Sequence, residues 1–229
     1  MFQADNSFIR SWSVSGGNIS PEKLTHLFKH FTGGRIIYRT RHKACYLVDF
    51  PEYGGEVVVK HYFEKRFWRY FLRPSLAYRE FLGFNRAESC GIPVAEVVAL
   101  GEKRNFWHLK EAFFVTRYLA GYRDGNEFIH GNGDEKLKDE FVRRNLELLA
   151  KLHNGGFVHG CFHPRNELFK VDDSGKMDII WIDLASVIPV GKTRKFTKAG
   201  DLDRFLCEFD FSAEKEVEYR AYYAQMRKK

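Results

Sequence analysis

Four polar side chains stand where they could bind the phosphates of a nucleotide and a metal ion. Lys60 ends an apolar, β-branched run, and Glu80 follows it twenty residues later within a stretch of helical periodicity. Asn166 ends the segment HGCFHPRN, and Asp183 ends a second apolar run seventeen residues further on. A lysine ammonium contacts phosphate oxygens, and Mg²⁺ prefers carboxylate and amide oxygens as ligands. Together these residues predict a site for a nucleoside triphosphate and Mg²⁺.

Each residue alone also has an ordinary structural explanation, because such lysines and glutamates are usually solvated and such aspartates often form turns. Their order and spacing favour chemistry instead. Transfer of a γ-phosphoryl group needs cations arranged around the triphosphate more than covalent help from the protein. A strand lysine, a helix glutamate, and an Asn and an Asp on the metal are the parts of a protein-kinase-like phosphotransferase that uses ATP and Mg²⁺. We expect Lys60 to form an ion pair with Glu80, and Asn166 to share the metal with Asp183.

Hydrophobic periodicity and turn residues predict the elements that position the first pair. A helix is expected over 21–31, with Ser20 as its N-cap. Helical periodicity over 74–89 places Glu80 on a second helix, which ends at Gly91. Three short apolar runs separated by turn residues predict an antiparallel meander over 35–38, 44–50 and 56–60.

The second half of the chain is predicted to be mostly helical, with its longest helix over 134–152 and further helix from Asp201 onward. Additional short strands are expected over 92–94, 97–100, 112–118, 168–171 and 179–182. The order indicates an α+β fold with two lobes. We expect an N-terminal extension over 1–34, a small β-rich N-lobe with one helix over 35–118, and a helical C-lobe over 119–229, with the ligand in the cleft between the lobes.

Composition limits the class of protein. The 229 residues are 44% hydrophobic and 29% charged, which favours a globular fold over disorder. The net charge of 37 − 30 = +7 favours anionic partners. No apolar run approaches the ~18 residues that span a bilayer, and the four cysteines show no CxxC spacing. We therefore expect a cytoplasmic protein in a reducing compartment.

Seven segments of the sequence match the pattern of a known family: RTRHKACYLV, VVVKHY, AYREFLGFNRAESCGIPVAEVVALG, FFVTRYLAG, LLAKLHNGGFVHGCFHPRNELF, WIDLAS and DLDRFL. Over about residues 35–205 the chain resembles the lipopolysaccharide kinase family, the core heptose and Kdo kinases of Gram-negative bacteria. The resemblance implies a protein-kinase-like fold and ATP with Mg²⁺. It also implies a lipid-linked saccharide, the lipopolysaccharide inner core, as acceptor, with peripheral contact to the cytoplasmic face of the inner membrane.

The resemblance also implies roles for further residues. Members of the family have a basic hairpin where other protein kinases have a glycine-rich loop, and Arg39, Arg41 and Lys43 fill that place here. The resemblance therefore implies that Arg39 and Arg41 contact the nucleotide. No GxGxxG is present. Asp201 and Asp203 resemble the acid that braces the catalytic loop, although an acid at the start of a helix is equally common.

One position departs from the family pattern. Active members read H-x-D in the catalytic loop, where the Asp accepts the proton of the substrate hydroxyl, and this chain has Cys161 there. A cysteine with a reference pKa of about 8.5 is largely protonated at pH 7. His163 is a candidate substitute base, with loop packing as its alternative role. Cys161, His163 and Asp183 are therefore the candidate catalytic residues.

The sequence supports two classes of function. The first is an ATP-dependent kinase for a sugar hydroxyl of the inner core, and the second is a nucleotide-binding pseudokinase with an interaction or regulatory role, which Cys161 motivates. A soluble kinase for aminoglycoside- or choline-like compounds is disfavoured by the chain length and the basic hairpin. The basic and aromatic stretch over 61–73 predicts either a membrane-interfacial element or a packed segment. No nucleic acid is expected as a partner, because no binding motif accompanies this stretch.

Overall fold

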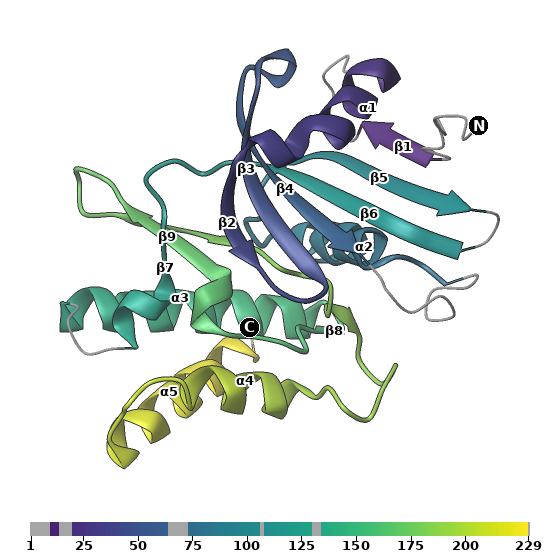
Figure 1. The fold of residues 1–229 in the computed structure, drawn as a ribbon. Helices are drawn as coiled ribbons and strands as arrows, with labels where there is room; N and C mark the ends of the chain where they lie inside the picture. The colour runs from purple at the N-terminus through teal and green to yellow at the C-terminus, as the bar shows by residue number, and fades with distance from the viewer. Residues whose placement is uncertain (1–9, 14–19, 64–72, 106–107, 130–133, 229) are drawn as a thin grey trace, which may run out of the picture. The chain divides into compact units, whose positions relative to one another are not determined.

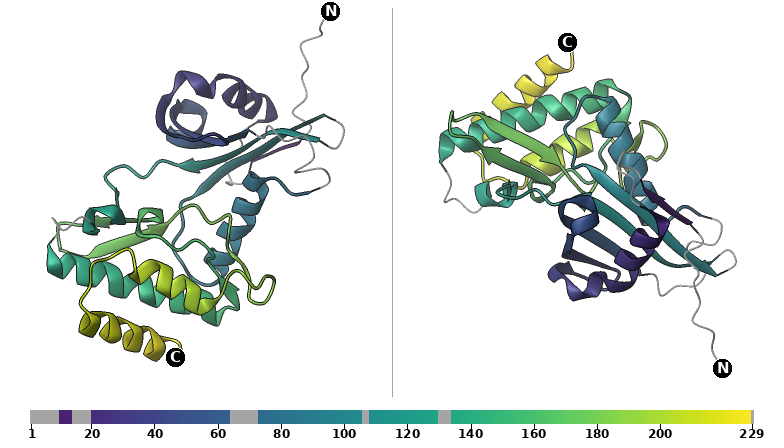
Figure 2. Two further views of the ribbon diagram at one scale, coloured as in Figure 1. Left: turned by 60° about the horizontal axis from the view of Figure 1, so that its bottom comes forward. Right: turned by 90° about the horizontal axis from the view of Figure 1, so that it is seen from above.

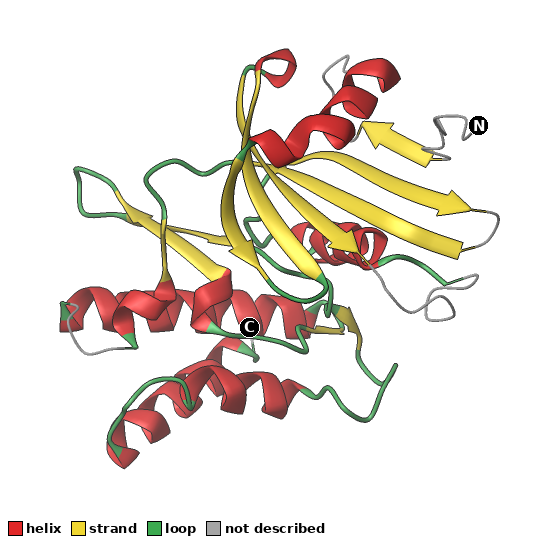
Figure 3. Ribbon diagram, viewed as in Figure 1, coloured by secondary structure: helices red, strands yellow, loops and turns green. Residues whose placement is uncertain are grey.

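The computed structural model describes residues 10–13, 20–63, 73–105, 108–129 and 134–228, which belong to two compact units (Figure 1). The first unit comprises Met1–Phe81 and Ala95–Tyr118, and the second comprises Leu82–Val94 and Leu119–Lys229. The first unit is rich in strands and the second is mostly helical (Figure 3). The predicted α+β fold is therefore confirmed.

The first unit contains a six-stranded antiparallel sheet in the order β1-β5-β6-β4-β3-β2. Its strands are β1 (Arg10–Ser13), β2 (Arg35–Arg39), β3 (Lys43–Phe50), β4 (Gly55–Phe63), β5 (Val97–Asn105) and β6 (His108–Arg117). The predicted meander corresponds to β2, β3 and β4. β5 and β6 are longer than predicted, because their pairing continues through polar residues that carry no apolar alternation.

Helix α1 (Pro21–His30) covers one face of this sheet. The Ser20 hydroxyl accepts a backbone N–H of the first turn at 3.4 Å, as its capping role predicts. Phe28 stacks on Phe113 of β6 with ring centroids 4.8 Å apart, and a Cβ at Gly101 would lie 2.5 Å from the Phe28 ring. The β1 strand and α1, both within the residues assigned to an extension from the sequence, thus contribute to the first unit. The predicted interfacial stretch lies largely outside the described residues, at 64–72.

Helix α2 (Leu76–Ser89) gives its first turns to the first unit and the rest to the second. The second unit also holds α3 (Glu135–Asn154), α4 (Lys198–Leu206), α5 (Ala213–Met226) and the strands β7 (Arg123–Asp124), β8 (Phe157–Val158), β9 (Glu167–Val171), β10 (Met177–Trp181) and β11 (Ile188–Pro189). Short 3₁₀ turns occur over Phe31–Gly33, Pro51–Tyr53, Gly125–Phe128 and Pro164–Asn166. β9 lies between β10 and β7, and β11 pairs with β8.

The core of the second unit forms around α3, against which α4 and α5 lie (Figure 2). The apolar side chains of this helix are buried from Phe141 to Leu152. Trp181 at the end of β10 is fully buried, and its indole N–H donates to the Asn145 side chain on α3 at 2.8 Å. This bond fixes the strand that leads to Asp183. In the described residues, none of the helices has the length and apolar composition needed to span a bilayer.

Candidate active site

Lys60 and Glu80 form an ion pair in the first unit. The Lys60 ammonium on β4 lies 2.5 Å from Oε1 of Glu80 on α2, and the Tyr62 hydroxyl donates to the other carboxylate oxygen. Glu80 is fully buried and Lys60 is 7% exposed. Burial of two charges costs several kcal/mol of desolvation, so the pair is a costly structural element that a nucleotide-binding role would explain.

Strand register decides which hairpin residues share a face with Lys60. Residues directly opposite each other in an antiparallel pair lie on the same face of the sheet. Cys45 is opposite Lys60, and Tyr38 is opposite Cys45. Lys43 lies two residues before Cys45 on β3 and therefore on the same face of the sheet. Its ammonium lies 5.8 Å from the centre of the Tyr38 ring. Tyr38 and Lys43 therefore lie on the face that carries Lys60.

Arg39 lies on the opposite face, because a bulge between Ile36 and Tyr38 shifts the alternation of β2. Arg39 is paired with Ala44, which belongs to the core beneath α1. Arg41 stands in the turn between β2 and β3. The predicted contact of Arg39 and Arg41 with a nucleotide remains a prediction. The register favours Lys43 among the basic residues of the hairpin.

In the second unit, Asp201 of α4 holds the backbone of the loop that contains Cys161. Its carboxylate accepts the backbone N–H groups of His159 and Gly160, each at 2.7 Å, and lies 3.1 Å from Nε2 of His153. Asp201 is 1% exposed. Asp203, the alternative suggested by the sequence, points away and contacts Arg220 at 2.6 Å. The bracing acid is therefore Asp201.

Cys161 has the properties of a neutral thiol. Burial raises its pKa, and the negative charge of Asp183 raises it further. The Asn166 side chain donates to the Cys161 carbonyl at 3.3 Å, which ties the two ends of the loop together. Because a protonated thiol cannot accept a proton from a substrate hydroxyl, Cys161 does not replace the missing aspartate as a base.

His163 has a partner that the sequence did not indicate. Its Nδ1 lies 2.6 Å from a carboxylate oxygen of Glu208, which follows α4. An ionised carboxylate accepts but does not donate, so Nδ1 carries a proton in this contact. In the neutral form of the ring, Nε2 is then the nitrogen with the lone pair. Glu208 is 45 residues away in the chain, and no motif marks it.

The backbone at Asp183 adopts an unusual conformation. Its φ of 59° is the one positive value at a non-glycine in the described residues, and such conformations cluster at functional sites. The segment after it is held by α2, because a Cβ at Gly83 would lie 1.8 Å from the Leu184 carbonyl and Arg86 donates to the Val187 carbonyl at 2.7 Å. The strain is thus maintained by close backbone packing.

Asn166 and Asp183 present donor groups that suit Mg²⁺. The backbone N–H of Ile182 donates to the Asn166 carbonyl at 2.8 Å, so the two residues stand on adjoining backbone segments. An amide and a carboxylate oxygen are the hard ligands this ion takes, usually completed by phosphates and water. The residues present therefore fit the metal that the sequence predicts.

Two buried titratable groups accompany this loop. Burial lowers the pKa of His159 to about 4. Its neutral ring packs edge-on against the Trp181 ring, with the ring centroids 5.4 Å apart. Glu167 follows Asn166 and is fully buried, with neither carboxylate oxygen hydrogen-bonded. Burial raises its pKa well above the usual value, so the group is held in its protonated form. No sequence pattern marks Glu167 as buried, because a glutamate beside apolar strand residues usually faces solvent.

Comparison with known proteins establishes the family. The model of the lipopolysaccharide kinase (Kdo/WaaP) family matches residues 40–223. The chain belongs to this family. A solved structure described as WaaP in complex with acyl carrier protein superposes with a TM-score of 0.66 at 16% identity, covering 96% of this chain and 91% of that one. That similarity confirms the protein-kinase-like fold. A comparison with curated proteins found no match.

Proposed function

We propose that this protein transfers the γ-phosphoryl group of ATP to a sugar hydroxyl of the lipopolysaccharide inner core. Membership of the Kdo/WaaP family supports a kinase of the lipopolysaccharide core. The observation that carries the proposal to individual residues is the buried Lys60–Glu80 pair. In protein-kinase-like phosphotransferases, an ion pair between a strand lysine and a helix glutamate holds the lysine against the nucleotide phosphates.

On the nucleotide side, Lys60 contacts the α- and β-phosphates. Glu80 holds the ammonium in position, and the Tyr62 hydroxyl fixes the Glu80 carboxylate in turn. Asn166 and Asp183 would hold Mg²⁺, which would supply positive charge to offset the negative charge of the nucleotide. The fixed backbone at Asp183 keeps its carboxylate in place without reorganisation during the reaction.

On the acceptor side, the proton of the attacking hydroxyl passes to Nε2 of His163. The Glu208 carboxylate accepts a hydrogen bond from Nδ1, with Nδ1 and the carboxylate oxygen 2.6 Å apart. This bond selects the tautomer and stabilises the imidazolium that forms. Cys161 stays a neutral thiol beside the reacting hydroxyl. A positioned general base contributes about 10²–10⁴-fold to a rate, so His163 would restore part of what the absent aspartate supplied.

The protonated state of Cys161 is the observation that favours the second candidate, a nucleotide-binding pseudokinase. In that case ATP and Mg²⁺ bind but no phosphoryl group reaches a saccharide. Peripheral contact with the cytoplasmic face of the inner membrane is part of the proposal, and rests on the family and on the basic and aromatic stretch predicted from the sequence.

Nucleotide binding is tested by calorimetry on Lys60→Met, with Lys110→Met as the matched control. Lys110 lies on β6 of the same sheet and is exposed. We expect Lys60→Met to weaken ATP binding at least tenfold and Lys110→Met to leave it unchanged. Equal affinity in the two variants would contradict the role of Lys60.

The base is tested by single-turnover transfer from radiolabelled ATP to purified core oligosaccharide. We expect His163→Ala to lower the rate about 10²-fold with ATP affinity unchanged, and Cys161→Asp to raise it at least tenfold. Transfer at the wild-type rate in His163→Ala would exclude His163 as the base. The absence of transfer in the wild type, with activity in Cys161→Asp, would identify a pseudokinase.

A further inference from the structure

The segment between Asp183 and Asp201 carries only positive charge. Residues 184–200 contain Lys192, Arg194, Lys195 and Lys198 and neither Asp nor Glu. In Figure 1 the segment is the yellow-green loop that leads into α4. Four cations in seventeen residues with no acid form a concentrated positive charge in the second unit.

Three of these cations have no compensating partner in the part of the chain that the structure describes. Lys198 donates to the His153 carbonyl at 2.7 Å and has a structural role. Lys192, Arg194 and Lys195 are exposed, and none of their side chains forms a hydrogen bond or ion pair with another described residue. Lys195 only lies over the Phe196 ring, 5.5 Å from its centre.

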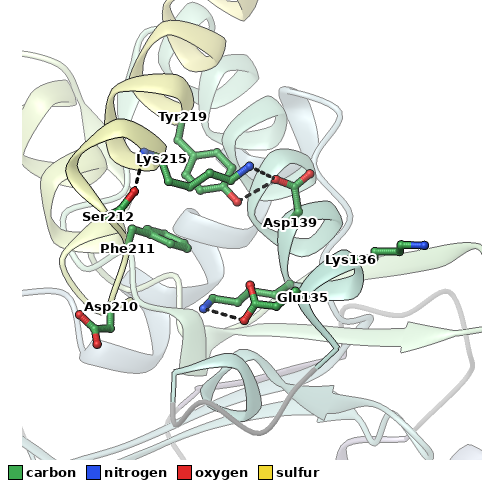
Figure 4. Close-up of a pocket in the computed structure, with 9 residues that line it drawn as sticks. Glu135, Lys136, Asp139, Asp210, Phe211, Ser212, Lys215 and Tyr219 are labelled. Atoms are coloured by element: carbon green, nitrogen blue, oxygen red, sulfur yellow. Dashed lines mark hydrogen bonds and ion pairs between the residues drawn. The ribbon is translucent and has the colours of Figure 1, made fainter.

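A polar pocket elsewhere in the second unit shows the contrasting arrangement. It has a volume of about 550 Å³ and lies between the first turns of α3 and α5 (Figure 4). Its Lys215 contacts Asp139 at 2.8 Å, and Lys138 contacts Glu135 at 3.5 Å. Lys215 and Lys138 are thus paired with acids of the same pocket, whereas the cations of the 192–195 turn are left available to an external anion.

The basic turn is anchored to the loop that receives the acceptor. On one side β11 pairs with β8, where Ile188 is opposite Val158, the residue before His159 in the chain. On the other side the Phe196 ring occupies the position a side chain would take at Gly160, 2.8 Å from its ideal Cβ. Both contacts fall on the residues just before Cys161. The turn that carries the three cations is therefore held at both ends beside the residues that lead to Cys161.

We propose that the turn over 190–196 binds an anionic group, a phosphate or a carboxylate, of the acceptor saccharide. The inference rests on the proposed function and adds the chemical class of acceptor to it. Arg194 offers a planar fork that suits bidentate binding of such groups, and the two lysines add point charges. Position beside the catalytic loop favours the acceptor over a lipid headgroup as the source of the anion.

The test measures binding of deacylated lipopolysaccharide core oligosaccharide by calorimetry. The variant is Lys192→Gln/Arg194→Gln/Lys195→Gln, and the control of equal net charge is Lys151→Gln/Lys170→Gln/Lys176→Gln, three exposed lysines of the second unit. We expect about tenfold weaker binding in the first variant only, since three exposed ion pairs contribute roughly a factor of two each. Oligosaccharide with its phosphates removed and its carboxyls reduced should bind the wild type and the first variant equally.

Two outcomes would overturn the inference. The first is native oligosaccharide binding the first variant as tightly as the wild type. The second is loss of binding to phosphatidylglycerol vesicles in that variant while oligosaccharide binding is retained, which would assign the turn to lipid. ATP affinity and phosphoryl transfer are measured in parallel. A wild type that binds oligosaccharide through the turn but transfers no phosphate would refute the proposed function and leave this inference standing.

Discussion

Replacement of Asp201 by alanine should separate a structural acid from a surface acid on the same helix. The Asp201 carboxylate accepts two backbone N–H groups at 2.7 Å and lies 3.1 Å from His153, all within the buried interior. Asp201→Ala leaves these three polar groups without an acceptor. At about 1–2 kcal/mol for each buried unsatisfied group, the free energy of unfolding should fall by about 3–6 kcal/mol.

Asp203→Ala is the matched control. Its carboxylate contacts Arg220 at 2.6 Å, but the Asp203 side chain is 57% exposed, and such surface pairs contribute less than about 1 kcal/mol. In thermal unfolding followed by circular dichroism, we expect Asp201→Ala to lower Tm by about 10 °C and Asp203→Ala by less than about 4 °C. Destabilisation by Asp203→Ala as large as that of Asp201→Ala would refute the assignment of the brace.

Three further predictions concern groups that hold the loops. Glu167→Met should stabilise the protein by about 1–3 kcal/mol in urea unfolding at pH 8, because it removes two buried oxygens that have no partner. The gain should shrink toward pH 4.5, because burial keeps Glu167 protonated in the folded wild type while the unfolded chain, with its ordinary pKa, takes up a proton only as the pH falls. Equal stability of the two proteins at pH 8 would contradict this. Burial lowers the pKa of His159 to about 4, so the wild type should lose about 3 kcal/mol of stability as the pH falls from 6.5 to 4. His159→Phe should lose less stability over the same pH range, measured as Tm. An identical dependence of Tm on pH in the two proteins would show that His159 does not cause it. Gly83→Ala should lower both Tm and the rate of phosphoryl transfer, since its Cβ would lie 1.8 Å from the Leu184 carbonyl. The same substitution in an unhindered helix would stabilise the protein, so a raised Tm would contradict the close packing.

The parts of the site that depend on local pattern could be predicted from the sequence. Lys60 and Glu80 were identified from strand and helix periodicity, and they form the expected ion pair. The Ser20 cap follows from its position before Pro21. Asp201 was one of two acids named from a family motif, and only burial distinguishes it from Asp203.

The remaining parts depend on contacts and backbone conformations that no local pattern encodes. Strict alternation along β2 would place Arg35 and Arg39 on one face, but the bulge after Ile36 moves Arg39 to the other. Glu208 reaches His163 only through the packing of the second unit. Apolar periodicity reveals neither the positive φ of Asp183 nor the close approach of α2 to the segment that follows it.

The most direct test of the central claim is transfer of radiolabelled phosphate from ATP to purified lipopolysaccharide core oligosaccharide, with and without Mg²⁺. The account predicts Mg²⁺-dependent labelling of the oligosaccharide by the wild type. It predicts none by Asp183→Asn, whose side chain keeps the shape and tolerates the positive φ of 59° but lacks the charge that holds the metal. Equal labelling by Asp183→Asn, or an unlabelled oligosaccharide in the presence of wild-type protein that binds ATP and Mg²⁺, would contradict it.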